Sequence, residues 1–368
     1  MARLSRVSRR TLLRAGIGVA VGSGLAGTAT AVFANSGSDS GIPGATLATK
    51  IANLSGPDET GPFGAAWSDL GIPARCPDGT MLFVGGDTWD GSGVGDGDWR
   101  APVALRSGNA DPNGIHIDGA VGGAHAVGLV GEDHHWVHDD KYTTAIPSDV
   151  FTVGDTMYMH LMRGVIYETH HSDFWRSTDN GETWEYLCQW PGDLYGGQFQ
   201  QKTYAVADDG YCYVLSTVFN RDIASGLLLH RVRQDQLGNP DAYEPWGYDG
   251  GWNWGNAPTT INGTRRWGEI CFRAMGGKYA FTWFQPDPNS IRAQVFPVPT
   301  ADLTATQEQV LILPAPRPDA QVANLVSNPY GGFIVPGSSF DDFHIVVSQW
   351  YDPQNYRFMH YRINGLAH

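Results

Sequence analysis

The stretch from Phe63 to Trp89 reads FGAAWSDLGIPARCPDGTMLFVGGDTW. In it, a Pro-Asp-Gly turn at 77–79 separates a short run before the turn from an apolar run after it. A turn of this chemistry between two such runs predicts an antiparallel β-hairpin. Because the second strand folds back on the first, Asp69 and Asp87 are predicted to lie side by side at one end of the hairpin.

Each of these two carboxylates has a tryptophan close by in the sequence, Trp67 near Asp69 and Trp89 near Asp87. Cleavage of a glycoside needs one acid to protonate the leaving oxygen and one carboxylate to attack the anomeric carbon or activate water. We therefore expect the two Asp to be catalytic and the two Trp to bind sugar rings. The alternative is a structural role, since an Asp at a strand end often serves as a turn or cap residue.

The same hairpin plan recurs along the chain, with a first strand, a Gly-containing turn, an aromatic-rich apolar strand and a third strand. Five copies are found, at residues 67–107, 150–176, 203–232, 269–296 and 322–361, and in the last copy the turn is predicted at Tyr330-Gly331-Gly332. Units of about 60 residues that cannot bury both faces alone are typical of propeller blades. We therefore predict an all-β, five-bladed β-propeller that forms one domain over residues 35–368.

An Asp-box motif supports the propeller independently. The segment from Ser177 to Trp184 reads STDNGETW. In this motif the Ser and the Asp stabilise a tight turn between outer strands, and the Trp packs beneath it. Asp179 is therefore expected to be structural and to lie outside the site.

Residues 1–34 have the features of an export signal. The segment from Ser8 to Leu13 reads SRRTLL, a twin-arginine signature, and it precedes a Gly/Ala-rich apolar stretch with small-residue cleavage sites. The protein is thus expected to be secreted or associated with the cell wall. No other run approaches the roughly 20 apolar residues that a membrane span requires.

The charge of the chain limits its partners. The formal net charge is −14, and removal of the five arginines of the export segment takes it to −19. Such an acidic surface repels nucleic acid and anionic polymers, so a neutral polysaccharide is the expected partner. A monomer is expected.

The four cysteines of the chain are Cys76, Cys188, Cys212 and Cys271. Four cysteines in an exported protein would allow two disulfides. They lie far apart, however, and Cys212 and Cys271 fall inside apolar strand patterns. Mostly free, buried thiols are therefore expected.

Aligning the strand ends of the five repeats assigns a set of polar side chains to one central mouth. Binding groups concentrate on loops that a rigid scaffold positions. The residues predicted to bind substrate there, besides Trp67 and Trp89, are Arg163, Gln201, Lys202, Asn220, Glu269, Gln285 and Trp350, with His125 reaching in from a loop. The same alignment places Asp149, Arg221 and Asn324 at the mouth.

Two loops leave alternatives open. The aromatic segment from Trp246 to Trp254 is either a stacking platform on the wall of a groove or packing between blades, because Trp usually buries most of its area. The His-rich segment 133–140 could hold a metal, but its spacing matches neither a closed zinc site nor a calcium loop. No metal and no cofactor are expected.

Three segments together resemble one known family: 67–71 (WSDLG), 82–89 (LFVGGDTW) and 99–102 (WRAP). They are similar to the domain of unknown function 4185, grouped as endo-D-arabinanases in glycoside hydrolase family 183. The resemblance extends from about Ala45 to the end of the chain. It implies a five-bladed propeller that cuts internal α-D-arabinofuranosyl linkages in the D-arabinan of mycobacterial arabinogalactan and lipoarabinomannan.

The resemblance also implies roles for the carboxylates. Asp87 corresponds to the nucleophile and Asp69 to the general acid/base of a retaining reaction, and Glu269 is a candidate third acid that tunes a pKa or holds a hydroxyl. The residues alone leave three alternatives open. These are a carbohydrate-binding propeller, a sialidase-like hydrolase and another furanosidase such as an L-arabinanase.

Overall fold

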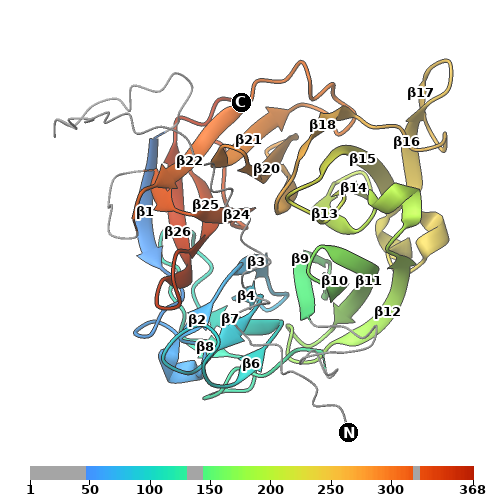
Figure 1. Cartoon of the computed structure of the whole chain (residues 1–368). Coiled ribbons are helices and arrows are strands. Elements are labelled where there is room, and N and C mark those ends of the chain that lie inside the picture. Colours follow the sequence, from blue (N-terminus) through green and yellow to red (C-terminus); the bar gives the residue numbers. More distant parts are fainter. Residues whose placement is uncertain (1–46, 131–143, 318–323) are drawn as a thin grey trace, which may run out of the picture.

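The computed structural model describes residues 47–130, 144–317 and 324–368. Within these ranges the protein is all-β (Figure 1), and its helices are short 3-10 turns at Gly61–Phe63, Leu194–Gly197, Gln234–Gln236 and Pro240–Ala242. No helix in the described residues is long and apolar enough to span a membrane. The predicted export segment and the His-rich loop 133–140 lie outside these ranges.

The hairpin predicted from the opening stretch is confirmed. Strands β3 (Ile72–Arg75) and β4 (Met81–Gly85) pair antiparallel across the Pro-Asp-Gly turn. The same hairpin continues into β2 (Trp67–Ser68) and β5 (Thr88–Trp89), which also pair antiparallel. The remaining strands of this region are β6 (Trp99–Arg100), β7 (Val103–Ser107) and β8 (Gly119–Ala120).

Four further sheets contain the rest of the strands. The second sheet contains β9 (Thr144–Val153), β10 (Thr156–Val165), β11 (Glu168–Ser177) and β12 (Glu185–Pro191). The third contains β13 (Gln201–Val206), β14 (Tyr211–Thr217), β15 (Ala224–Arg233), β16 (Glu244–Tyr248), β17 (Trp252–Trp254) and β18 (Asn262–Arg266). The fourth contains β19 (Ile270–Met275), β20 (Lys278–Pro286), β21 (Asn289–Phe296), β22 (Gln309–Ala315) and β23 (Leu325–Ser327). The last contains β24 (Pro329–Ile334), β25 (Phe343–Trp350), β26 (Tyr356–Asn364) and β1 (Leu47–Asn53).

The sheets surround a common centre (Figure 1). Their innermost strands contact one another in the order β3, β9, β13, β19 and β24, and β24 in turn contacts β3. The last sheet joins both ends of the described chain, because β1 pairs with β26. The repeat pattern did not predict this strand.

Apolar side chains fill the spaces within and between these sheets. Phe272, Phe281 and Trp283 of the fourth sheet are fully buried and pack with Leu215 and Leu229 of the third. A sheet with two apolar faces is stable only when other layers cover both. The four cysteines are free and buried within such packing, as predicted.

The Asp-box prediction is also confirmed. Ser177 donates its hydroxyl to Asp179 at 2.7 Å, and Asp179 accepts from both the backbone and the hydroxyl of Thr183. The Trp184 indole donates to the Gly181 carbonyl at 3.1 Å. These contacts fix the turn that joins β11 to β12.

The boundaries of the last repeat were predicted wrongly. Its innermost strand is β24 (Pro329–Ile334), so Gly331 and Gly332 lie inside a strand and do not form the predicted turn. Both have positive φ angles, of 79° and 105°, and the pairing with β25 shifts register there. A β-bulge with two glycines has the sequence signature of a turn, which explains the error.

The aromatic segment from Trp246 to Trp254 forms the β16–β17 hairpin, which projects from the outer edge of the third sheet (Figure 1). Trp246 packs against Trp254 at 4.9 Å, whereas Tyr248 and Trp252 are about half exposed. Of the two alternatives, the packing of rings holds for Trp246 and Trp254, which lie against the apolar core, and the hairpin lies away from the common centre.

Candidate active site

Asp69 and Asp87 lie opposite each other in the first hairpin. Ser68 pairs with Thr88 and Ile72 with Val84, so the shared register aligns the two Asp residues. The Asp69 carbonyl accepts the Gly86 N–H at 3.2 Å, which ties the strands together at this point. A Cβ on Gly86 would lie 2.5 Å from Asp69 Oδ1, so the carboxyl occupies space that only a glycine leaves free.

The Asp69 carboxyl is surrounded by few hydrogen-bond donors. Its Oδ2 accepts the Tyr330 hydroxyl at 2.9 Å, and its buried Oδ1 has no hydrogen-bond partner among the described residues. The pKa of Asp69 is raised to about 7: burial and the charges of Asp87 and Glu269 raise it, and the hydroxyls of Tyr356 and Tyr330 partly offset this. Asp69 is thus protonated in a large fraction of molecules near neutral pH.

Asp87 is in a different environment. Its Oδ1 accepts the indole N–H of Trp99 at 2.9 Å. A donor of this kind favours the ionised form of a carboxyl. Trp99 in turn stacks on Trp89 with ring centroids 6.3 Å apart, and Trp89 contacts Tyr356 edge-on at 5.7 Å. The hairpin therefore places Asp69, whose pKa is raised, beside Asp87, which is held by an indole N–H.

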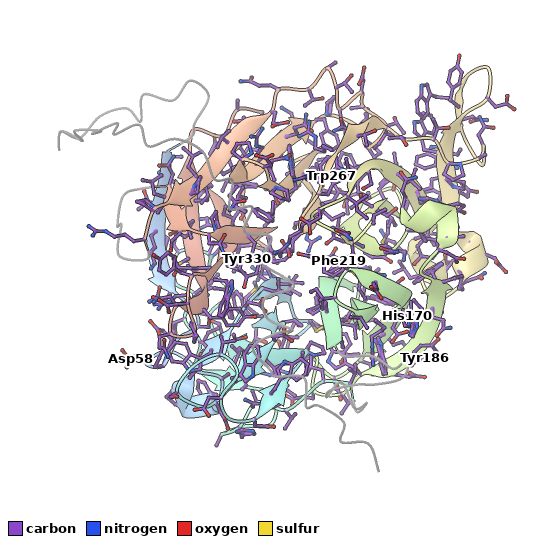
Figure 2. The ribbon with its side chains drawn as sticks, viewed as in Figure 1. Asp58, His170, Tyr186, Phe219, Trp267 and Tyr330 are labelled. Atoms are coloured by element: carbon purple, nitrogen blue, oxygen red, sulfur yellow. The ribbon has the colours of Figure 1, made fainter. Side chains whose placement is uncertain are left out.

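A second charged group lies next to this pair. Glu269 and Arg221 form an ion pair, and Glu269 Oε2 accepts the Gly331 N–H at 3.2 Å. The Arg221 guanidinium lies 5.1 Å from the Tyr330 ring centroid and 5.2 Å from that of Phe284. Tyr330 and Phe219 are seen beside the central space in Figure 2.

Comparison with known proteins identifies the family. Residues 55–362 match the family described as "Domain of unknown function (DUF4185)". The chain belongs to this family. A relative in Mycolicibacterium smegmatis, named "Uncharacterized 35.9 kDa protein in asd 3'region", is 26% identical over 337 residues, covering 83% of this chain and 95% of the relative.

Solved structures of low identity share the fold of this DUF4185 domain. The GH43_1 enzyme of Xanthomonas citri superposes with a TM-score of 0.52 at 11% identity, covering 85% of this chain and 91% of its own. The α-L-arabinofuranosidase PaAbf62A of Podospora anserina superposes with a TM-score of 0.50 at 13% identity, covering 88% and 99%. At these identities the likeness extends to the fold alone.

The DUF4185 domain buries most of the aromatic rings that were expected to be open to sugar. Trp67 is 7% and Trp89 is 6% exposed, and the Trp67 indole donates to the Gly91 carbonyl at 2.8 Å. Trp350 is half-buried and packs edge-on against Tyr356 at 5.3 Å. Trp67 and Trp89 are thus part of the packing around the two carboxylates and do not form an open platform.

Four residues predicted to line the mouth are instead fully buried and bonded within the protein. Lys202 donates to Ser172 Oγ at 2.9 Å and lies over the rings of Trp190 and Phe199. The other three are Arg163, Gln201 and Gln285. Arg163 lies 3.5 Å from Asp173. Gln201 donates to the Gly268 carbonyl at 2.8 Å, and Gln285 donates to the Asp287 carbonyl at 3.2 Å. Strand-end alignment cannot tell which face of a strand a side chain occupies, and here the inward face is the packed one.

Two more predicted residues lie on loops, as expected. Asn220 is partly exposed after β14, and its side chain accepts the backbone N–H of Asp222 at 2.9 Å, which is a turn contact. His125 is exposed and lies within 3.4 Å of Asp98 and 3.1 Å of Arg100. Arg100, which His125 contacts, directly follows in the sequence the Trp99 that donates to Asp87.

Sequence reasoning missed Tyr330, Tyr356 and Trp99 as parts of the site. Trp99 carried a signal, because it belongs to a segment that matches the family. Tyr330 carried none, because it lies 261 residues from Asp69 in the sequence and was assigned to a turn.

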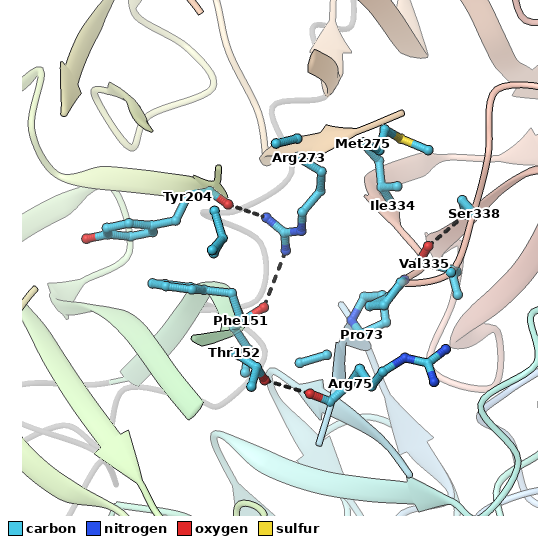
Figure 3. Close-up of a pocket in the computed structure, with 16 residues that line it drawn as sticks. Pro73, Arg75, Phe151, Thr152, Tyr204, Arg273, Met275, Ile334, Val335 and Ser338 are labelled. Carbon is cyan, nitrogen blue, oxygen red and sulfur yellow. Dashed lines mark hydrogen bonds between the residues drawn. The ribbon is translucent and has the colours of Figure 1, made fainter. Parts of the chain in front are cut away.

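Asp149 is not at the mouth; it lies beside a cavity at the other end of the innermost strands. The cavity measures about 270 Å³, and Figure 3 shows its lining, which includes Arg75, Phe151, Arg273 and Ile334. Arg273 contacts both oxygens of Asp149, at 2.6 and 2.9 Å. Asp69 and Glu269 lie before the first residues of β3 and β19. Arg75 and Met275, which line the cavity, are the last residues of the same two strands. The cavity is therefore separate from the Asp69 site.

No group of three or more His, Cys, Asp and Glu side chains suited to a metal occurs among the described residues.

Proposed function

We propose that this chain is an exported, endo-acting glycoside hydrolase that cleaves internal α-D-arabinofuranosyl linkages of D-arabinan in mycobacterial arabinogalactan and lipoarabinomannan. The observation that carries the proposal is the juxtaposition of Asp69 and Asp87 in one hairpin, where the pKa of Asp69 is raised to about 7 and Asp87 accepts the indole N–H of Trp99. Two carboxyls with separated proton affinities are what acid and nucleophile roles require. The resemblance of the hairpin segments to the endo-D-arabinanases supplies the substrate.

In this mechanism Asp87 attacks the anomeric carbon while Asp69 donates its proton to the departing glycosidic oxygen. Asp69 then removes a proton from a water molecule, which cleaves the bond between the sugar and Asp87 and restores both carboxyls. Retention needs carboxyls about 5 to 5.5 Å apart. Cross-strand partners have Cβ atoms about 4.5 to 5.5 Å apart, which is consistent with a retaining pair.

The arrangement of the sheets supports the propeller. We take the sheets whose innermost strands are β3, β9, β13, β19 and β24 as five blades, with β1 completing the last one. Such a fold gathers loops from all blades at one end of the axis. Structures that share the fold include an arabinofuranosidase, which agrees with a furanoside as substrate. The twin-arginine segment supports an extracellular place of action.

A carbohydrate-binding propeller is the second candidate, and the exposed rings of Tyr248 and Trp252 favour it. Rings of this kind often stack on sugars. They lie at the outer edge of the third sheet, away from the two Asp residues, so binding there would not exclude catalysis.

The test is incubation of the mature protein with mycobacterial arabinogalactan, with L-arabinan and a sialoside as parallel substrates. Release of short D-arabino-oligosaccharides is the expected result, and prior treatment with a chelator should leave it unchanged. Retention on the polysaccharide without cleavage would favour the binding function. Cleavage of L-arabinan alone would refute the D-arabinan assignment.

A further inference from the structure

The Asp69 carboxyl is held from the far end of the chain. The Tyr330 hydroxyl on β24 donates to Asp69 Oδ2 at 2.9 Å, and Tyr330 is 6% exposed. Asp69 Oδ1 has no partner among the described residues. The Tyr330 hydroxyl therefore holds one oxygen of this carboxyl and, together with the hydroxyl of Tyr356, stabilises its ionised form.

The Tyr330 ring is held in turn by an ion pair. Arg221 lies against the face of the ring and pairs with Glu269, which also accepts the N–H of Gly331, the next residue of the strand. The Glu269 carboxylate thus binds both the backbone of β24 directly after Tyr330 and the Arg221 guanidinium that lies on the Tyr330 ring. A Cβ on Gly331 would lie 3.0 Å from the Phe333 ring and 3.3 Å from Ser348 Oγ, so the close approach depends on glycine.

We propose that Tyr330 is the positioning residue of Asp69 and that the Arg221–Glu269 pair acts through Tyr330. The inference rests on the proposed function, in which Asp69 is the acid/base. The side chains come from the first hairpin, from the β14–β15 and β18–β19 connections and from β24. The third carboxylate, Glu269, thus reaches Tyr330 through the Arg221 cation, in addition to the effect of its own charge on the pKa of Asp69.

Tyr330→Phe removes only the hydroxyl. Because a hydrogen bond to a carboxylate favours its charged form, its loss should move the alkaline limb of the kcat/KM profile upward by about one pH unit. We expect kcat to fall about tenfold, with KM changed less than about threefold, since the hydroxyl serves proton transfer and not binding.

The matched control is Tyr243→Phe. Tyr243 is a buried tyrosine directly before β16, and its hydroxyl donates to the Leu237 carbonyl at 2.8 Å. Its loss should lower the melting temperature to a similar extent and leave the pH profile unchanged. A Tyr330→Phe variant with the unshifted profile of this control would show a merely structural tyrosine and would overturn the proposal.

The ion pair is tested by replacing both partners, Arg221→Met with Glu269→Met, which avoids an unpaired buried charge. In the wild-type background this change should lower kcat about tenfold. In the Tyr330→Phe background it should cost less than about threefold, since coupled residues are not additive. Full additivity, or a KM increase above about tenfold, would place the pair on the substrate and refute its action through Tyr330.

A readout without substrate separates this inference from the function. The pKa of Asp69 can be obtained from the pH dependence of the stability difference between the wild type and Asp69→Asn. Tyr330→Phe should raise that pKa whether or not D-arabinan is cleaved. An inactive wild type would refute the proposed function, whereas an unchanged Asp69 pKa would refute the positioning role.

Discussion

Asp149 and Asp69, two aspartates on the sheets around the common centre, have opposite surroundings. Asp149 accepts hydrogen bonds from Arg273, the Thr203 hydroxyl and the backbone N–H groups of Val150 and Tyr204, at 2.6 to 2.9 Å. Asp69 has no guanidinium partner among the described residues; it accepts the Tyr330 hydroxyl, its pKa is lowered by the Tyr356 hydroxyl as well, and the charge of Asp87 acts against its ionisation.

The difference separates structural from reactive acids. A carboxylate that is surrounded by donors and paired with a guanidinium is a fixed charge, and its hydrogen bonds link neighbouring sheets. A carboxyl without those partners exchanges its proton near neutral pH, at a cost in stability. Counting donors therefore assigns Asp149 to the scaffold and Asp69 to the chemistry.

The largest expected effect is on turnover. Asp87→Asn and Asp69→Asn should each lower kcat by about 10³-fold or more while the protein stays folded, because each removes a step that the other residue cannot supply. Hydrolysis of D-arabinan measures the loss, and circular dichroism confirms the fold. Asp155→Asn, in an exposed turn, is the control and should retain activity. A variant of either site Asp with near-normal turnover would remove that residue from the mechanism.

The next effect is on stability at Asp149. Asp149→Asn leaves Arg273 without its charge partner and should lower the free energy of unfolding by about 3–5 kcal/mol. Activity per folded molecule at low temperature should stay close to that of the wild type. Denaturant titration gives the stability. A fully stable variant would contradict the structural assignment of Asp149.

At Asp69, in contrast to Asp149, replacement of the carboxyl is expected to raise the free energy of unfolding. Its carboxyl has a pKa of about 7 in the folded protein and 3.8 ordinarily, so the wild type loses stability as pH rises from about 4 to 7. Asp69→Asn lacks this loss. It should be more stable than the wild type by on the order of 2–4 kcal/mol at pH 8 and nearly equal at pH 4. If the wild type and Asp69→Asn have equal melting temperatures at both pH values, the pKa of Asp69 is not raised in the folded protein.

Burial of the His230 imidazole should make stability depend on pH in the opposite direction to Asp69, with a smaller effect. His230 lies 4.5 Å from the Phe199 ring, and neither ring nitrogen has a hydrogen-bond partner among the described residues. Burial lowers the pKa of His230 to about 3, with a contribution from Lys202. The unfolded chain therefore takes up the proton first, and stability falls as pH drops below about 6.5.

His230→Phe removes this contribution. At pH 5 the variant should lose about 2 kcal/mol less than the wild type does relative to pH 7.5. Thermal melts at the two pH values test this. If the wild type and the variant lose the same stability, His230 is already protonated in the folded protein.

Local features of the sequence were sufficient to predict local structure. The Pro-Asp-Gly turn between two strands predicted the hairpin and its register. The Asp box predicted its own turn, because its hydrogen bonds join residues at most four positions apart. Buried thiols followed from cysteines within apolar runs.

Prediction failed where side chains meet across sheets. Lys202 and Gln201 were correctly placed at the start of a strand, but neighbouring sheets cover them, and strand position alone cannot show this. The glycines of β24 were taken for a turn because a bulge and a turn share the same residues.

The sequence by itself determined the all-β class, the first hairpin and the opposition of Asp69 and Asp87, since these follow from turn chemistry and alternation over short separations. Only the tertiary structure decided which carboxyl is deprived of donors. Apart from the N–H of Val150, the hydrogen-bond partners described above for the side chains of Asp69, Asp149 and Glu269 lie 48 to 261 residues away in the sequence. Burial and hydrogen bonding set a pKa, and both depend on how the sheets pack around their common centre.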